Sequence, residues 1–256
     1  MTYHEKSPSS RWQEIQEIWK DYKNFYKLLR GFIVVALLLA MGAYIFVEQL
    51  TDFSMNVLTE AIGVLGTVLI VDILARYRAE NERKQELIFQ MGSDNNLIAR
   101  SAVMLLKQRG WTKNGSLKNA QLGNTNLSDE DLVYANLEKT SFVWATCVKT
   151  NFSSANLRGA DFYSANLEKA IFSGADLENS NFRGANLTGA VFSHTRLQNA
   201  DLRSANMSEA FLMNADITGA NLEKSTLPDG TRWTSNTDMR RFTDPTHSDF
   251  WYVDRD

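Results

Sequence analysis

The chain has 256 residues, 44% of them hydrophobic, and a formal net charge of −3. This length allows one large or two small domains with a sizeable core, and the hydrophobic share argues against a disordered chain. The balance of 27 basic against 30 acidic residues lacks the basic surface of a nucleic-acid-binding protein, so we expect no nucleic-acid partner. The single cysteine, Cys147, excludes an internal disulfide framework.

Residues 1–30 are predicted to form an amphipathic cytoplasmic or interfacial helix. Their large apolar residues follow spacings of three and four: Trp12, Ile15, Trp19, Tyr22, Tyr26 and Leu29. Aromatic residues with interspersed lysines favour a helix that lies in the lipid headgroup region. A short coiled coil, and with it self-association, is the alternative.

Residues 31–47 carry no charge, and 17 helical residues nearly span a bilayer core of about 30 Å. We therefore predict a first transmembrane helix over about 31–50. A cleaved secretory signal peptide is the alternative. The run begins about 30 residues into the chain, however, and ends in bulky side chains rather than a small-residue cleavage pattern.

A second apolar stretch contains two acidic residues, Glu60 and Asp72. A helix over about 55–76 places both near the membrane interfaces and lets Asp72 pair with Arg76 one turn later. Intramembrane acids are costly, which makes these two residues candidates for a functional role, although interfacial acids without a transport role are the simpler explanation. A re-entrant or peripheral segment is the alternative to a full span.

Positive charge predicts how the hairpin of residues 31–76 is oriented. No lysine or arginine occurs between residues 48 and 60, whereas basic residues flank the two spans on the other side. These residues are Lys20, Lys23, Lys27, Arg30, Arg76, Arg78, Arg83 and Lys84. We expect a two-span protein of the cell (inner) membrane, with the lipid bilayer as a partner and with both termini in the cytoplasm.

Residues 77–116 are predicted to be a helical connector and an N-terminal cap. The charged sequence YRAENERKQELIFQ continues the second span, and GSDNN then interrupts it, with Ser93 or Asp94 as the N-cap of a further helix. That helix covers residues 97–109 and ends at Gly110. Its predicted inner side consists of Leu97, Ala102, Leu105 and Leu106.

From residue 120 onward a five-residue unit recurs without insertion or deletion. Its 22 centres run from 122 to 227; 13 are Leu and six are Phe, and the others are Cys147, Met207 and Ile217. Two residues before the centre, 15 positions are Ala and six are Ser or Thr, with Glu130 as the only large exception. Asn or Asp stands between these two positions in 14 units, and the two following residues are mostly polar and variable.

A period of five fits neither an α-helix nor a β-strand, so the chain must turn about once per unit. In a solenoid, each short side buries one large and one small residue, and Asn or Asp serves the turn. The predicted repeat core includes Phe142, Phe152, Phe162, Phe172, Phe182, Phe192, Leu157, Leu167, Leu177 and Leu187.

Units such as Ala135-Asn136-Leu137 and Ala175-Asp176-Leu177 carry the A(D/N)LXX signature, so residues 117–227 resemble the pentapeptide-repeat family. The resemblance implies an all-β solenoid, a right-handed quadrilateral β-helix with four units and twenty residues per coil. On such a coil, Phe142, Phe162 and Phe182 would stack on one face, and the other three phenylalanines on the opposite face. The expected fold is this solenoid with an N-terminal α-helical transmembrane hairpin.

Residues 228–256 break the rhythm at Pro228 and are predicted to be a C-terminal cap, with Trp233, Phe242, Phe250 and Trp251 gathered in it. The LPDGT sequence here also resembles a membrane-anchored bacterial subgroup of the family. That subgroup combines it with a membrane hairpin and a GW-x-x-x-GSL junction. The junction residues in this chain are Gly110, Trp111, Gly115, Ser116 and Leu117.

No catalytic, cofactor or metal site is predicted. Cys147 occupies a core centre and should be a buried hydrophobe, and His194 is expected at an outward position. His4 and His247 lie far from it in sequence. The Asn and Asp series could suggest calcium binding, but the glycine-rich nonapeptide pattern of calcium-binding repeats is absent.

These patterns predict a non-enzymatic, membrane-anchored protein whose cytoplasmic rod is a scaffold for a cytoplasmic protein partner. Two alternatives stay open. Some members of the family resemble DNA and protect topoisomerases, which requires a strongly negative rod, whereas residues 117–226 hold 12 acids and 9 bases. A transport or sensing role of the hairpin would rest on Glu60 and Asp72, and two spans enclose no pathway without oligomerisation.

Overall fold

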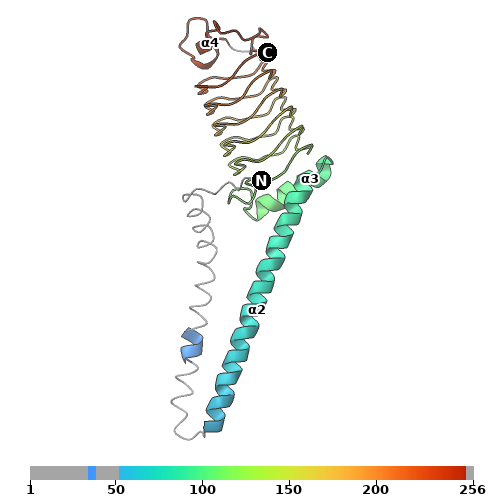
Figure 1. The fold of residues 1–256 in the computed structure, drawn as a ribbon, viewed down its shortest axis with the longest axis vertical. Coiled ribbons are helices and arrows are strands. Elements are labelled where there is room, and N and C mark those ends of the chain that lie inside the picture. Colours follow the sequence, from blue (N-terminus) through green and yellow to red (C-terminus); the bar gives the residue numbers. More distant parts are fainter. Residues whose placement is uncertain (1–33, 39–51, 252–256) are drawn as a thin grey trace, which may run out of the picture. The chain divides into compact units, whose positions relative to one another are not determined.

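The computed structural model describes residues 34–38 and 52–251, which form two compact units, Met1–Tyr77 and Arg78–Asp256. The predicted helix of residues 1–30 and most of the first span lie outside the described residues. Within that span, residues 34–38 are helical. The labelled helices are α2 (Asp52–Met91), α3 (Asn96–Gln108) and α4 (Arg240–Thr243) (Figure 1).

Helix α2 runs for 40 residues without a break. The second apolar stretch therefore continues into the charged connector, as the sequence predicts. Its part from Asn56 to Met91 is long and apolar enough to cross a membrane, and no side chain of the apolar window is buried within the structure. The predicted ion pair between Asp72 and Arg76 is present, with 2.8 Å between Oδ2 and Nη2.

Helix α3 begins at Asn96, one residue before the predicted start at 97, and its N-cap lies later than predicted. Its N-cap is Asn95, whose side chain accepts a hydrogen bond from the Leu97 backbone nitrogen at 3.0 Å, so the prediction of Ser93 or Asp94 is wrong. Leu97 is exposed, so its predicted place on the inner side is wrong; that side consists of Ala99, Ala102, Val103 and Leu106. Gly110 follows the helix with φ of 70°, as expected for a residue that ends a helix.

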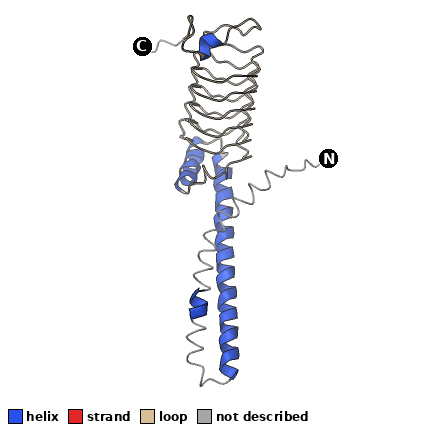
Figure 2. Ribbon diagram, turned by 90° about the vertical axis from the view of Figure 1, so that its left-hand side faces the viewer, coloured by secondary structure: helices blue, strands red, loops and turns tan. Residues whose placement is uncertain are grey.

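The five-residue units build a solenoid of parallel coils. Every parallel β-bridge joins residues 20 positions apart, from the pair Gln121 and Ser141 to the pair Asn206 and Thr226. Each side of a coil contributes a single bridging residue, so Figure 2 draws the stacked coils as loops. Four units per coil, which the family resemblance implies, are therefore present in the structure.

The turns of the solenoid follow one backbone pattern. A positive φ of 53–73° recurs at every fifth residue from Asn119 to Lys224, that is, two residues after Leu117 and after each centre from 122 to 222. The backbone nitrogen of such a residue donates to the next coil, as Trp144 does to the Tyr163 oxygen at 3.0 Å. The Asp161 carboxylate accepts from the Tyr163 backbone nitrogen at 3.0 Å, which is the turn chemistry expected of Asn and Asp before the centre.

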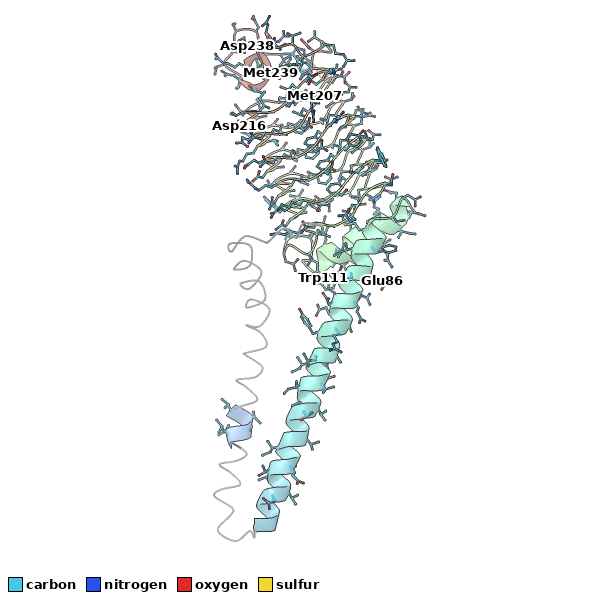
Figure 3. The ribbon with its side chains drawn as sticks, viewed as in Figure 1. Glu86, Trp111, Met207, Asp216, Asp238 and Met239 are labelled. Atoms are coloured by element: carbon cyan, nitrogen blue, oxygen red, sulfur yellow. The ribbon has the colours of Figure 1, made fainter. Side chains whose placement is uncertain are left out.

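The solenoid core consists of the inward positions. All six phenylalanine centres are fully buried, and they form two stacks on opposite sides of the coils. In one stack, the Phe162 ring lies 4.7 Å from Phe142 and 4.9 Å from Phe182, with the planes nearly parallel. The Met207 centre, labelled in Figure 3, lies among the coils, whereas Asp216 lies on their outer side.

Different elements close the two ends of the solenoid. At the N-terminal end, Leu87 and Met91 of α2 and the indole of Trp111 are buried in the core of the first coils. Lys84 and Arg109 make cation–π contacts with the Trp111 ring, with their cationic groups 5.7 and 5.5 Å from the ring centre. The C-terminal end is covered by a segment that includes α4.

In the C-terminal segment, Phe242 is buried, and Trp233 and Trp251 pack against the same core. The rings of Phe242 and Trp251 meet edge to face at 5.9 Å. Arg241 Nη2 lies 2.6 Å from Asp229 Oδ2, which joins α4 to the turn after the last unit.

Candidate interaction surfaces

The outward positions form four faces, because every fourth unit stacks on the same side. Face 1 holds the centres 122 to 222, face 2 the centres 127 to 227, face 3 the centres 132 to 212 and face 4 the centres 137 to 217, each in steps of twenty. The sequence predicts variable polar residues on all of them. The structure shows instead that the faces differ in chemical character.

Face 1 carries exposed aromatic residues. Trp144 and Tyr163 are exposed, and their rings lie 6.4 Å apart in an edge-to-face arrangement. Arg183 is exposed one coil further on. Arg203 of the following coil donates through Nε and Nη2 to Asp201 at 2.8 and 2.6 Å, and this hydrogen-bonded pairing lowers the pKa of the Asp201 carboxyl. Trp, Tyr and Arg are the residue types that most often dominate binding at protein interfaces.

Face 3 is the most apolar of the four. Ile171, Val191 and Phe211 follow one another in bridging positions where most units carry Asn or Asp, and all three are half-buried. Tyr134 is exposed on the same face, and Lys113 Nζ lies 5.2 Å from the centre of its ring. The sequence signal for this apolar part of face 3 is the loss of Asn or Asp at positions 171, 191 and 211, after Asp131 and Asn151 at the first two bridging positions of the face.

Face 4 carries a network of ion pairs. Arg158 and Arg196 both contact the carboxylates of Asp176 and Glu178, so that four charges on three successive coils neutralise one another. Face 2 mixes both signs more locally, as in the contact between Lys169 and Glu168 at 3.6 Å. Neither face presents a uniform field.

The residues singled out in the repeat occupy the positions that the sequence assigns them. Cys147 is fully buried, and loss of solvation raises the pKa of its thiol to about 12, so it is not poised for nucleophilic chemistry. His194 is exposed in a turn with φ of 57°. No group of three His, Cys, Asp or Glu residues that could hold a metal ion occurs in the described part of the chain.

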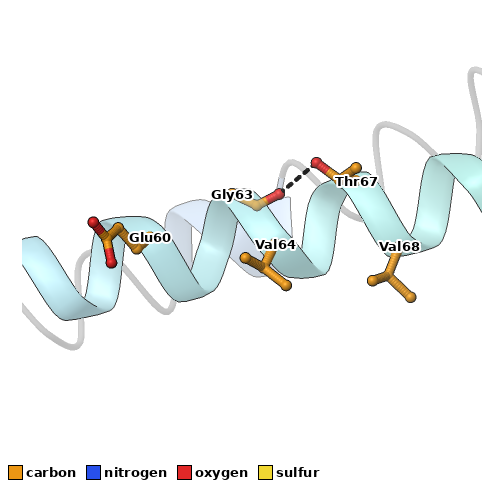
Figure 4. Close-up of a pocket in the computed structure, with 5 residues that line it drawn as sticks. All are labelled: Glu60, Gly63, Val64, Thr67 and Val68. Carbon is orange, nitrogen blue, oxygen red and sulfur yellow. Dashed lines mark hydrogen bonds between the residues drawn. The ribbon is translucent and has the colours of Figure 1, made fainter.

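The two acids of the apolar stretch lie apart on α2. Twelve residues separate Glu60 from Asp72, which corresponds to about 18 Å along a helix, so they do not form one site. Glu60 lines a depression of about 430 Å³ together with Gly63, Val64, Thr67 and Val68 (Figure 4). The Thr67 hydroxyl donates to the Gly63 carbonyl at 2.9 Å.

A Cβ atom added at Gly63 or Gly66 would meet nothing within 4 Å. Neither glycine is therefore in close contact with another segment among the described residues.

Residues 135–229 match the family model of pentapeptide repeats, with eight repeat copies. No significant match to this chain was found among curated proteins.

Solved structures are similar to part of this chain. Rfr23 of the cyanobacterium Cyanothece 51142 is 26% identical, covers 50% of this chain and 99% of its own, and gives a TM-score of 0.33. HetL of Nostoc sp. strain PCC 7120, involved in heterocyst differentiation regulation, is 28% identical over 45% of this chain and 73% of its own, with a TM-score of 0.25. QnrB1, a plasmid-mediated fluoroquinolone resistance protein, is 23% identical over 43% and 64%, with a TM-score of 0.30.

Proposed function

Because this chain is a pentapeptide-repeat protein with a right-handed β-helical solenoid, we propose that it is a membrane-anchored, non-enzymatic scaffold whose solenoid binds a cytoplasmic protein. The observation that carries this proposal is the exposure of Trp144 and Tyr163 on face 1. Exposed large aromatic side chains on a rigid surface are typical of protein interfaces. The repeat supplies the rigidity, since each coil is hydrogen-bonded to its neighbours.

The membrane part of the proposal is a hairpin of two spans, residues 31–50 and 55–76, with both termini in the cytoplasm. It is supported by the exposed apolar side chains of α2 and by the basic residues that follow the apolar stretch. The test is labelling of intact cells with a membrane-impermeant maleimide. Thr51→Cys should react from outside and Asn119→Cys only after the membrane is opened; labelling of Asn119→Cys in intact cells would contradict this topology.

Charge pairing argues against a DNA-mimicking solenoid. Such a solenoid needs unneutralised negative charge along a face, whereas Asp176 and Glu178 of face 4 are paired with Arg158 and Arg196. We therefore favour a partner that recognises the side chains of one face rather than the net charge of the whole solenoid.

The experiment is photo-crosslinking in cells with the full chain. A photoreactive amino acid is placed at position 143 on face 1, 173 on face 3, 148 on face 2 or 198 on face 4. We expect one protein to be captured from face 1, which carries exposed Trp144 and Tyr163, and not from faces 2, 3 and 4. Equal capture from all four positions, or capture of nothing but copies of this chain, would overturn the scaffold proposal.

A further inference from the structure

Glu130 is the one repeat residue that breaks the pattern of small side chains at the inward position before the centre. The other 21 such positions hold Ala, Ser or Thr. The Glu130 side chain is nevertheless 91% buried, with a relative exposure of 9%. A buried carboxylate destabilises the fold unless it is well paired, so this residue is a departure that the solenoid itself does not require.

The carboxylate faces a cavity of about 570 Å³ between α3 and the first coils. From α3 the cavity is lined by Arg100, Met104 and Lys107, among others. From the solenoid it is lined by three consecutive acids, Asp129, Glu130 and Asp131. The cavity therefore combines an exposed methionine side chain with a set of charges.

The charges of the cavity are incompletely paired. Lys107 Nζ donates to Asp131 Oδ2 at 2.7 Å, a hydrogen bond that lowers the pKa of this carboxyl. Glu130 Oε1 lies 3.3 Å from Arg100 Nε, but in a geometry that makes no hydrogen bond, and this buried oxygen has no hydrogen-bond partner among the described residues. Three carboxylates face two cations, so the lining carries a net negative charge.

Burial outweighs the nearby cations at Glu130. Loss of solvation raises the pKa of its carboxyl, although Arg100 and Lys107 act in the opposite direction. The Glu130 carboxylate thus has little contact with water and too few hydrogen-bond donors. A ligand that supplied a hydrogen-bond donor with a positive charge would relieve both deficits.

We infer that this cavity binds an alkylammonium or guanidinium group on an apolar stem, as carried by a lysine or arginine side chain of a protein partner. The cationic head would donate to the Glu130 carboxylate beside Asp129, and the stem would lie against Met104. A metal ion is not the ligand that these acids fit, since no three acidic or histidine side chains among the described residues converge on one point. The inference builds on the scaffold proposal, because it names a basic segment as what the partner presents.

The test uses the full chain in detergent micelles with ¹³C-labelled methionine methyl groups, and the probes are n-butylammonium and n-butylguanidinium. We expect a saturable shift of the Met104 methyl signal with a dissociation constant of about 1 mM, and no shift with butyrate or butanol. Glu130→Ala should abolish the shift and Glu130→Gln should weaken binding at least about tenfold. Glu138→Gln is the matched control, because its acid pairs with Lys118 outside the cavity, and it should bind as the native chain does.

Thermal unfolding separates a ligand-binding role of Glu130 from a structural one. Since alanine is the usual residue at this position, Glu130→Ala should raise the Tm by a few degrees. A lower Tm for both Glu130→Ala and Glu130→Ser, unchanged binding by these variants, or no saturable shift in the native chain would overturn the inference.

Two further probes distinguish the sources of the cation. A short peptide with one lysine should bind at least as tightly as spermidine; preferential binding of spermidine would overturn the assignment to a protein side chain. If butylammonium does not bind, the photo-crosslinking result for the scaffold proposal still stands. If photo-crosslinking captures no partner, butylammonium binding at Glu130 can still be observed. The two proposals can therefore fail separately.

Discussion

In the middle coils, Phe162 and Phe172 each pack between equivalent rings of the coil before and the coil after, at 4.7 and 4.9 Å for Phe162 and at 5.2 and 5.0 Å for Phe172. The first coil has no preceding coil. Its inner residues contact the end of α2 instead, and the Thr125 hydroxyl donates to the Met91 and Ser93 carbonyls at 2.7 and 3.0 Å. The middle is thus held by copies of one contact and the N-terminal end by unique contacts, which is where a local exception such as Glu130 can be accommodated.

The largest loss of stability is expected for a substitution in the middle coils. Phe162→Ala should lower the free energy of unfolding by about 3–5 kcal/mol, because the ring is fully buried between two others and leaves a cavity. Phe162→Leu is the control and should cost clearly less, since leucine is the commonest residue at this position. Guanidinium unfolding of the full chain, followed by circular dichroism, measures both. Equal losses of unfolding free energy for the two variants would mean that the stacked rings contribute no special stability to the middle coils.

At the N-terminal end, the corresponding test is Thr125→Val. It should cost about 1–2 kcal/mol, since the buried Met91 carbonyl loses its donor. Thr150→Val is the matched control inside the coils, where the hydroxyl donates to the Leu127 carbonyl alone at 2.7 Å. The same guanidinium titration should give the larger loss for Thr125→Val. A larger loss for Thr150→Val would show that α2 contributes less to the end of the solenoid than a coil does.

The sequence predicts the middle coils better than the end for a physical reason. Because the five-residue period is strict, the position of a residue within its unit predicts whether its side chain is buried. The burial of Phe162 and Leu177 can therefore be predicted from the neighbouring residues alone. The positive φ at Tyr134 and Trp144 could not be read in this way. Bulky residues disfavour that conformation, and it is imposed by hydrogen bonds to the next coil.

At the end, the contacts are non-local. GSDNN offers several N-cap residues, and the selection of Asn95 depends on how the turn after α2 meets the first coil, where the Ser93 carbonyl accepts from the Asn126 backbone nitrogen. The burial of Glu130 likewise depends on α3, which precedes it by more than twenty residues. The identity of Glu130 as an exception was visible in the sequence; the cavity that it faces was not.

A smaller effect is expected at Gly92, which lies between α2 and the first coil. A Cβ atom there would come within 3.2 Å of the Phe89 carbonyl oxygen and 3.3 Å of the Gln121 carbonyl oxygen. Gly92→Ala should therefore cost about 1 kcal/mol in the guanidinium titration. Gly63→Ala is the control, because a Cβ at Gly63 meets nothing within 4 Å, and it should cause no loss. Full tolerance of Gly92→Ala would mean that this close approach can relax.

The smallest effect is a difference in pH dependence between Glu130 at the end and Asp201 in the coils. Burial raises the pKa of Glu130 above its usual 4.5, so the stability that it contributes is present below pH 4.5 and is lost as the pH rises through its folded-state pKa. The hydrogen bonds from Arg203 lower the pKa of Asp201 below 3.8, so its contribution is present above pH 3.8 and is lost as the pH falls through its folded-state pKa.

Glu130→Gln should therefore gain stability relative to the native chain between pH 4.5 and neutral pH. Asp201→Asn should lose stability at neutral pH and approach the native chain below pH 3.8. Guanidinium titrations of both variants across this range measure the two trends. If the Glu130→Gln difference stayed constant with pH, the carboxylate would have to be solvated in the folded chain, and the N-terminal end would then differ from the middle in its packing but not in its electrostatics.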